Sequence, residues 1–234
     1  MIYDKSSDKT RWLGVPARQS RLTASKAWTE AVLADAPLYP SGFELFCQDT
    51  PAHTVYFSNS GLVKLMRSEE NGREVILSLK FSGSLLGAEA VINRVPYPFS
   101  AVAVTKCRLA RLRACDFLEL VSSDQQLAAC LNEELSAEIL AQTARLSQIA
   151  CLSARQRLEN LLGQLACDQS LESNRSEIRF QLPLRHWEVA QLLAITPTYL
   201  SKLLTELERE EIITRAKGWF VIRQPDKLWR GPSP

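Results

Sequence analysis

Residues 182–208 constrain the fold of this chain most, because two short apolar-periodic segments meet there across a tight turn. The apolar positions of the two segments are Val189, Leu192 and Leu193, followed by Leu200, Leu203, Leu204 and Leu207. Their spacing predicts two helices that each bury one face. Ala194-Ile195-Thr196 forms the turn, and Thr196-Pro197 supplies an N-cap and then the first helical position, where proline is favoured. The stretch therefore predicts a helix-turn-helix.

Short strands are predicted on both sides of this motif. Residues 178–182 form one strand before it, and residues 212–214 and 219–222 form two strands after it, joined by a turn at 216–218. A strand hairpin in this place is typical of a winged helix-turn-helix, with Lys217 at the tip of the wing.

The region from about residue 42 to residue 112 has a β pattern. Asn71-Gly72 separates two strand-like runs, residues 61–66 and 75–81, and predicts a hairpin. Alternation in the second run predicts that Val75, Leu77, Leu79 and Phe81 face the core. Residues 100–105 and 108–112 suggest a further strand pair. Short strands at this spacing favour a small barrel or jelly roll.

Helices are predicted on both sides of the β region. Residues 27–39 read as a short helix stopped by Pro40, and residues 154–166 as a helix that begins after Ser153. Residues 116–150 contain no proline or glycine and predict a helix of about 25 residues, about 37 Å long. A helix of this length favours a dimer seam, and the alternative is a helix packed back onto the barrel. The predicted seam residues are Leu131, Leu135, Ile139, Leu146 and Ile149.

Composition excludes several classes of protein. The 46% apolar and 23% charged content is that of a globular chain, and no apolar run approaches the roughly 18 residues of a membrane span. The six cysteines are scattered, which predicts buried reduced thiols rather than a metal centre. Residues 151–234 carry 12 basic and 10 acidic side chains, so charge permits DNA binding without requiring it.

The order of these elements resembles the CRP/FNR family of bacterial transcription regulators. Residues 189–213 and 71–91 carry the resemblance most specifically. It implies an α+β protein with an N-terminal jelly-roll-like β-roll sensor, a long dimerisation helix and a C-terminal winged helix-turn-helix. The expected boundaries are a flexible arm at 1–26, the β-roll at 27–115, the helix and hinge at 116–152, and the DNA-binding domain at 153–234.

The resemblance also implies partners and contact residues. A homodimer would bind a near-palindromic site on double-stranded DNA and contact RNA polymerase. The expected base contacts are Pro197, Thr198, Ser201 and Lys202, and the expected phosphate contacts are His186, Thr196, Tyr199 and Lys217. Tyr199 has packing inside the domain as its alternative. Thr198 stands where many family members have a glutamate that reads cytosine, so the operator is expected to depart from the usual half-site.

The sensor lacks the residues that hold a cyclic nucleotide in such regulators. The corresponding stretches read Gly87-Ala88-Glu89-Ala90 and Pro98-Phe99-Ser100-Ala101, so that Phe99 replaces the arginine that pairs with the phosphate. The expected effector-pocket residues are Gly87, Glu89, Ser100 and Ala101, and cyclic AMP is not expected to bind.

Other inputs stay open. Haem held by Cys47 or His53, a thiol switch at Cys107, Cys115 or Cys130, an unknown small-molecule effector, and no effector at all are the alternatives. No catalytic constellation, metal site or resident cofactor is predicted.

The sequence thus predicts a cytoplasmic, sequence-specific DNA-binding regulator that acts as a dimer and has no membrane partner. The alternative is a ligand-binding or protein-interaction module that no longer reads DNA specifically.

Overall fold

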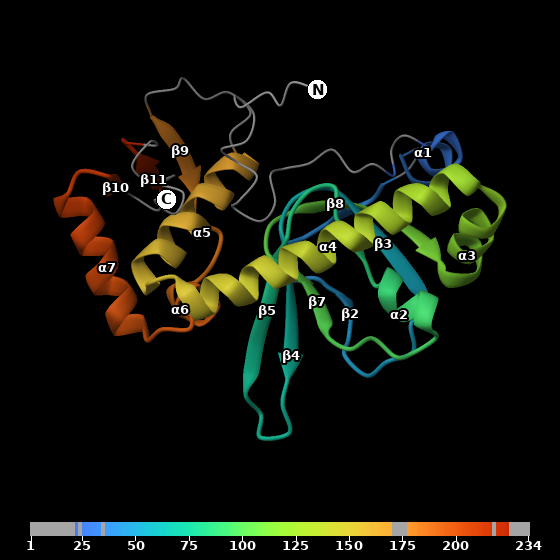
Figure 1. Cartoon of the computed structure of the whole chain (residues 1–234), viewed down its shortest axis with the longest axis horizontal. Coiled ribbons are helices and arrows are strands. Elements are labelled where there is room, and N and C mark those ends of the chain that lie inside the picture. Colours follow the sequence, from blue (N-terminus) through green and yellow to red (C-terminus); the bar gives the residue numbers. More distant parts are fainter. Residues whose placement is uncertain (1–21, 23–24, 34–35, 170–176, 217–218, 225–234) are drawn as a thin grey trace. The chain divides into compact units, whose positions relative to one another are not determined.

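The computed structural model describes residues 22, 25–33, 36–169, 177–216 and 219–224 (Figure 1). The contacts divide the chain into an N-terminal unit that ends at Glu138 and a C-terminal unit that begins at Ile139. None of the helices in these described ranges is both long enough and apolar enough to cross a membrane.

Two four-stranded sheets form the N-terminal unit, in agreement with the predicted β-roll. Their strand orders are β1-β8-β3-β6 and β2-β7-β4-β5, and every neighbouring pair is antiparallel. The strands are β1 (Leu38–Tyr39), β2 (Glu44–Phe46), β3 (Thr54–Ser60), β4 (Val63–Ser68), β5 (Glu74–Lys80), β6 (Leu85–Leu86), β7 (Ser100–Ala103) and β8 (Cys107–Arg113).

Strand β3 separates two apolar cores because its successive side chains point to opposite faces. Tyr56 belongs to one buried cluster, which includes Phe46, Leu65 and Leu109. Val55 and Phe57 belong to the other, whose further members come mainly from the helices and from β8. The sheet that contains β3 is thus covered on both faces.

The hairpin at Asn71-Gly72 is confirmed, whereas the predicted buried face of its second strand is wrong. Strands β4 and β5 pair as a hairpin (Figure 1). Gly72 takes a φ of +78° in its turn. Directly paired residues share a face of the sheet, and buried Leu65 is paired with Ser78. Ser78 therefore faces inward, and Ile76 on the other side of the register shift is buried as well. Leu77, which the shift leaves without a partner, is 37% exposed, whereas Phe81, just beyond β5, is buried as predicted.

The predicted pairing of residues 100–105 with residues 108–112 is also wrong, because the corresponding strands β7 and β8 lie in different sheets. The chain crosses between the sheets at residues 104–106, where the Val104 amide donates to the Leu62 carbonyl over 2.7 Å. Gly61 turns the same corner on the neighbouring connection, with a φ of +99°, and a Cβ there would lie 2.6 Å from the Cys107 sulfur. Close packing at this corner sends each strand to the other sheet.

Helix α1 (Lys26–Leu33) is shorter than the predicted 27–39 segment. Pro37 disfavours a helical conformation at the preceding residue, Ala36, so the helix cannot continue to residue 39. Strand β1 begins directly after Pro37, at Leu38. Leu22 and Ser25 are fully buried, and the Ser25 hydroxyl accepts from the Trp28 amide at the start of α1. The end of the predicted arm 1–26 is therefore packed against the core, while residues 1–21 lie outside the described part.

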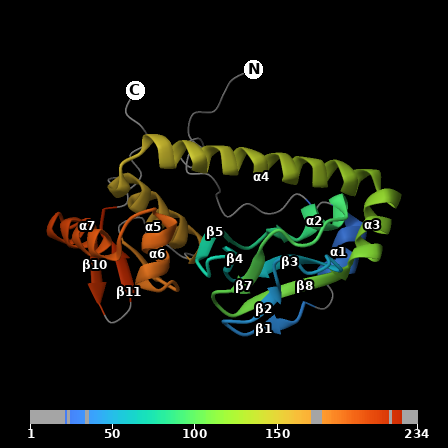
Figure 2. The ribbon, with the colours of Figure 1, turned by 90° about the horizontal axis from the view of Figure 1, so that it is seen from below.

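The predicted helix over 116–150 is divided in two. Helix α3 (Ala114–Ser123) ends at Asp124, whose φ of −115° and ψ of 103° are extended, and α4 (Gln125–Cys151) follows. The Asp124 carboxylate accepts from the amides of Gln126 and Leu127, so it caps α4 and ends the first helix. Figure 2 shows the sharp change of direction between α3 and α4. A 27-residue α4 still agrees with the predicted length.

Helix α4 carries two kinds of apolar residue. Leu127 and Leu131 are buried in the helix-covered cluster of the N-terminal unit, and Leu135 packs against that cluster. Further along, Ile139, Leu140, Leu146 and Ile149 are 66%, 70%, 69% and 44% exposed. Of the predicted seam residues, Leu131 is therefore already covered within its own chain. Ile139, Leu146 and Ile149 are the ones that present apolar surface to a partner.

The C-terminal unit contains helices and a three-stranded antiparallel sheet of order β10-β11-β9. Its elements beyond α4 are α5 (Ala154–Gln169), β9 (Ile178–Gln181), α6 (His186–Leu192), α7 (Pro197–Arg209), β10 (Ile213–Ala216) and β11 (Trp219–Ile222). They agree with the predicted winged helix-turn-helix, including both wing strands. Phe180 and Phe220 meet between neighbouring strands, with ring centroids 5.6 Å apart.

Candidate nucleic-acid interface

The turn between α6 and α7 is built from backbone hydrogen bonds and one unusual dihedral. Ala194 takes a φ of +52°, which lets its amide donate to Gln191 and the Ile195 amide donate to Ala190. Val189 and Leu193 anchor the end of α6 in the core, at 1% and 3% exposure. The three-residue turn predicted from the sequence is confirmed.

Helix α7 begins as predicted. The Thr196 hydroxyl accepts from the Tyr199 amide over 3.2 Å, and Pro197 takes the first helical position. The apolar face is buried completely, with Leu200, Leu203, Leu204 and Leu207 each at 3% exposure or less. The opposite face is therefore fixed toward the outside, because rotation of the helix would expose four leucines.

That outer face carries the predicted DNA contacts. Pro197, Thr198, Ser201 and Lys202 are all exposed, as is Thr196, whose hydroxyl is already used in capping the helix. Tyr199 is 44% exposed, so packing inside the domain does not account for it. Ser201 and Lys202 also border a shallow hollow of about 300 Å³ together with Thr205, Glu206 and Arg209. Lys217 lies outside the described residues.

His186 and Ser201 come together across the helix pair. The His186 Nε2 lies 3.3 Å from the Ser201 Oγ, and that hydroxyl lies 3.2 Å from the Pro197 carbonyl. His186 is the first residue of α6 and Ser201 lies in the second turn of α7, so the contact joins the two helices. The structure thus connects an expected phosphate contact with an expected base contact.

An ion pair fixes the wing against the end of α7. The Arg215 guanidinium on β10 donates to both carboxylate oxygens of Glu208, over 2.9 and 2.6 Å. These hydrogen bonds lower the pKa of Glu208 and raise the pKa of Arg215. The first wing strand is therefore held to the same helix that carries the exposed polar face.

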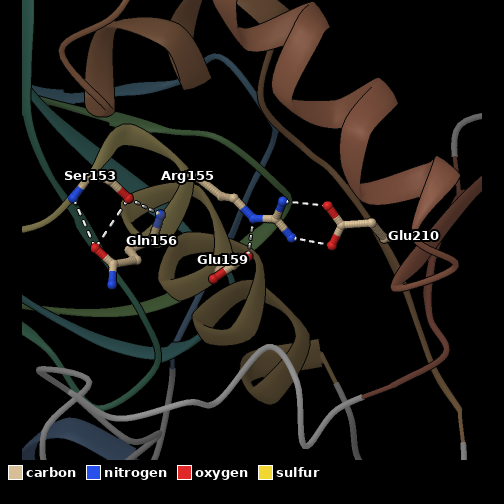
Figure 3. A network of polar contacts seen from close by, with 5 residues as sticks. All are labelled: Ser153, Arg155, Gln156, Glu159 and Glu210. Atoms are coloured by element: carbon tan, nitrogen blue, oxygen red, sulfur yellow. Dashed lines mark hydrogen bonds and ion pairs between the residues drawn. The ribbon is translucent and has the colours of Figure 1, made fainter. Parts of the chain in front are cut away.

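A second charged network holds the C-terminal end of α7 to α5 (Figure 3). Arg155 donates to both carboxylate oxygens of Glu210, over 2.6 and 2.5 Å, and to Glu159 over 2.8 Å. The hydrogen bonds to Glu210 and Glu159 raise the pKa of Arg155. Ser153 and Gln156 cap the start of α5 reciprocally, which confirms Ser153 as the predicted N-cap.

Arg157 joins the end of α4 to the helix-turn-helix. Its Nη1 donates to the Leu152 carbonyl over 2.7 Å, and its Nε and Nη2 donate to the Leu193 carbonyl over 3.1 and 3.0 Å. Both carbonyls lie where a helix ends and leaves acceptors without an intrahelical partner. One guanidinium therefore ties the last turn of α4 to the turn before α7.

The expected effector-pocket residues have separate roles in the N-terminal unit. Gly87 precedes helix α2 (Ala88–Asn93) with a φ of +79°, and a Cβ there would lie 2.8 Å from the Tyr97 ring. The Ser100 hydroxyl accepts from the backbone N–H of Gln48 over 2.9 Å, and Ala101 is fully buried in β7. Glu89 is half-buried, and this burial raises its carboxyl pKa.

Aromatic side chains fill the neighbourhood of the expected phosphate position. Tyr97 is buried and stacks on Phe46 with ring centroids 4.0 Å apart, and its hydroxyl donates to the Thr54 carbonyl over 2.6 Å. Phe99 packs against the same cluster. Lys80, the cation that opposes the rise in the Glu89 pKa, forms an ion pair with Glu138 on α4. A hollow of about 460 Å³ in this unit lies beside the β4–β5 hairpin instead, and none of the four expected pocket residues lines it.

The cysteines do not follow the prediction of buried thiols. Cys107 is buried, but Cys47, Cys115 and Cys151 are exposed and Cys130 is intermediate. The side chain of Cys167 lies outside the described part. Cys115 and Cys151 lie at helix ends, where a small side chain is tolerated without burial.

Comparison with known proteins assigns both halves of the chain. Residues 38–124 match the cyclic nucleotide-binding domain family, and residues 156–230 match the Crp-like helix-turn-helix domain family. The nitrogen fixation regulation protein FixK of Azorhizobium caulinodans is 29% identical over 217 residues, which cover 91% of this chain and 85% of that protein. The chain belongs to the CRP/FNR family of transcription regulators.

Other members of the CRP/FNR family align over most of their length. The cyclic AMP receptor protein of Thermus thermophilus is 27% identical over 187 residues, which cover 80% of this chain and 83% of that protein. The solved structure of FixK2 from Bradyrhizobium japonicum has the same fold, with a TM-score of 0.70 at 19% identity over 83% of this chain and 94% of that one. Of these relatives, the Azorhizobium protein is named as a regulation protein and the Thermus protein as a receptor protein.

The sequence did not point to the residues that hold α7 and the preceding turn in place in this CRP/FNR regulator. Arg155, Arg157, Glu210 and the Glu208–Arg215 pair were not singled out. Arg155 and Glu159 are four residues apart on one helix, and this spacing is a usable signal. The other partners are far apart in the chain, so no local pattern identifies them.

Proposed function

We propose that two copies of this regulator bind a near-palindromic DNA site, each inserting α7 into one of two successive major grooves. The exposed polar face of α7 carries the proposal, because its apolar face is buried and its C-terminal end is held by two charged networks. Lys202 donates to guanine, and Pro197, Thr198 and Ser201 contact neighbouring base edges. Thr196, Tyr199 and Lys217 contact DNA phosphates and so position the helix in the groove.

Binding to genomic fragments tests this reading. Wild type should bind a saturable site at physiological salt, and Lys202→Ala should weaken binding by about 1–3 kcal/mol. Lys106→Ala is the matched control, because it removes another exposed lysine, from the N-terminal unit. Binding that is independent of sequence for wild type would contradict the proposal and favour a protein-interaction module in its place.

The dimer forms through the exposed apolar residues of α4. Ile139, Leu146 and Ile149 follow a spacing of seven and three residues, which is the pattern of a helix-to-helix seam. Leaving these side chains in water is unfavourable, whereas a second copy of α4 would cover them.

Sedimentation of Leu146→Asp tests the seam. This variant should sediment as a monomer under conditions where wild type is a dimer. Ser147→Asp is the matched control, since it places the same charge about 100° around the helix. A wild-type monomer, or an undisturbed Leu146→Asp dimer, would refute the seam.

Cyclic AMP is not the effector of this regulator. A buried cyclic phosphate needs a cation, and the position that would supply it is Phe99 in an aromatic cluster. The half-buried Glu89 carboxyl would also meet any phosphate bound beside α2. Titration calorimetry with cyclic AMP and cyclic GMP should show no saturable heat, and saturable binding of either would overturn this part of the proposal.

Membership of the family supports two further parts of the proposal. As a regulator that acts at promoters, the protein would contact RNA polymerase once it is bound to DNA. A regulator whose partner is chromosomal DNA would act in the bacterial cytoplasm. Co-purification of RNA polymerase on operator DNA, compared with the same DNA lacking the operator, tests the first of these.

A further inference from the structure

The contact between His186 and Ser201 changes what Ser201 can read. The Ser201 hydroxyl lies within hydrogen-bonding distance of two groups, the His186 Nε2 at 3.3 Å and the Pro197 carbonyl at 3.2 Å. Both side chains are exposed, and Ser201 borders the same hollow as Lys202. A base that approaches Ser201 therefore meets a hydroxyl whose hydrogen already has a partner.

The position of that hydrogen follows from counting donors. A serine hydroxyl has one hydrogen to donate, and a carbonyl oxygen can only accept. Both contacts are satisfied together only when Ser201 donates to Pro197 and accepts from a hydrogen on the His186 Nε2. If Nε2 were the acceptor, Ser201 would have to donate to it, and the Pro197 contact would be lost.

We propose that His186 is a positioning residue that makes Ser201 a hydrogen-bond acceptor toward DNA. This inference rests on the proposed function and assigns His186 a role other than the expected phosphate contact. The outward lone pair of the Ser201 oxygen is then available to an exocyclic amino group, N4 of cytosine or N6 of adenine, and repels the keto oxygens of guanine and thymine.

Lys202, the residue after Ser201, recognises the opposite kind of base group. Lys202 has only donors and selects acceptors such as guanine O6 and N7. A free serine reads either kind of group, because its hydroxyl rotates to donate or to accept. Holding Ser201 in one orientation therefore adds discrimination that the serine alone does not provide. Displacement of water by DNA strengthens the hydrogen bond that holds it.

Selection of bound sequences from a randomised operator tests the proposal. At one half-site position, wild type should favour cytosine or adenine over guanine and thymine by about five- to tenfold, the size of one hydrogen bond to a base. Ser201→Ala and His186→Ala should each abolish this preference at that position and leave the preferences at the other positions unchanged. The double variant should lose no more than either single variant.

Rescue separates positioning from a general structural role. His186→Gln should keep the preference, because the glutamine Nε2 can donate to the Ser201 oxygen as the imidazole Nε2 does. Tyr199→Phe serves as the phosphate-type comparison and should weaken binding to all sequences alike.

Three results would overturn the proposal. A uniform loss of affinity in His186→Ala, with a smaller salt slope and unchanged base preferences, would make His186 a phosphate contact. Unchanged preference in Ser201→Ala, or failure of His186→Gln to restore it, would also contradict the assignment. If wild type selects no sequence at all, the proposed function itself fails, which is a distinct outcome.

Discussion

Replacing Arg157 by methionine should loosen the helix-turn-helix from the end of α4 while keeping most of the apolar stem of the side chain. The change removes four hydrogen bonds, of 2.7, 3.0, 3.1 and 3.5 Å, and leaves the Ile149, Leu152 and Leu193 carbonyls without their charged donor. A hydrogen bond to a charged group contributes about 1.5–3 kcal/mol, but water replaces part of it at a half-buried site, so we expect a loss of about 2–3 kcal/mol in total.

Amide hydrogen exchange in α6 and the following turn measures this loss locally. A loss of that size lowers protection of the Leu193 and Ala194 amides by about 30- to 150-fold. Arg179→Met is the matched control: its guanidinium is 71% exposed and pairs with Glu177 at 3.5 Å, and we expect a change below about 0.5 kcal/mol. Equal protection in the two variants would refute the role assigned to Arg157.

Two further predictions concern the N-terminal unit. Gly87→Ala should destabilise the protein by about 3 kcal/mol, because a left-handed φ and a clash with the stacked Tyr97 ring act together, whereas Gly72→Ala, with open space around it, should cost about 1 kcal/mol; equal urea midpoints for the two would contradict this packing. Glu89→Gln should raise the melting temperature at pH 7, because burial raises the folded pKa of this carboxyl and its charged form therefore costs stability. That cost is absent below about pH 4.3, the value of an unfolded glutamate, and grows as the pH rises through the folded pKa, so the gain should vanish in acid; a gain independent of pH, or one shared by exposed Glu70→Gln, would count against it.

Elements specified by local chemistry were predictable from the sequence. The Thr196-Pro197 cap, the four leucines of α7, the Asn71-Gly72 turn and the Ser153 cap each act within a few residues of the chain, and all appear where expected. Their common property is that one short segment contains both the donor and the acceptor, or the whole apolar face.

Features decided by distant partners were not predictable. The buried face of β5 depends on a register shift opposite β4, and the separation of β7 from β8 depends on the corner at Leu62. Asp124 ends α3 because its carboxylate accepts hydrogen bonds from the first amides of α4 and from the hydroxyl of Ser25, which is 99 residues away in the chain. The contact between His186 and Ser201 likewise requires the angle between two helices, which spacing alone does not supply.

Sequence-specific binding by a dimer is the central claim, and selection from a random DNA library at physiological salt tests it most directly. The bound fraction should converge on two inverted half-sites whose centres lie about 10–10.5 base pairs apart, one turn of DNA. Lys202→Ala should lose the preference at one base of each half-site. A library that stays random, with affinity that falls with salt equally for every sequence, would contradict the account.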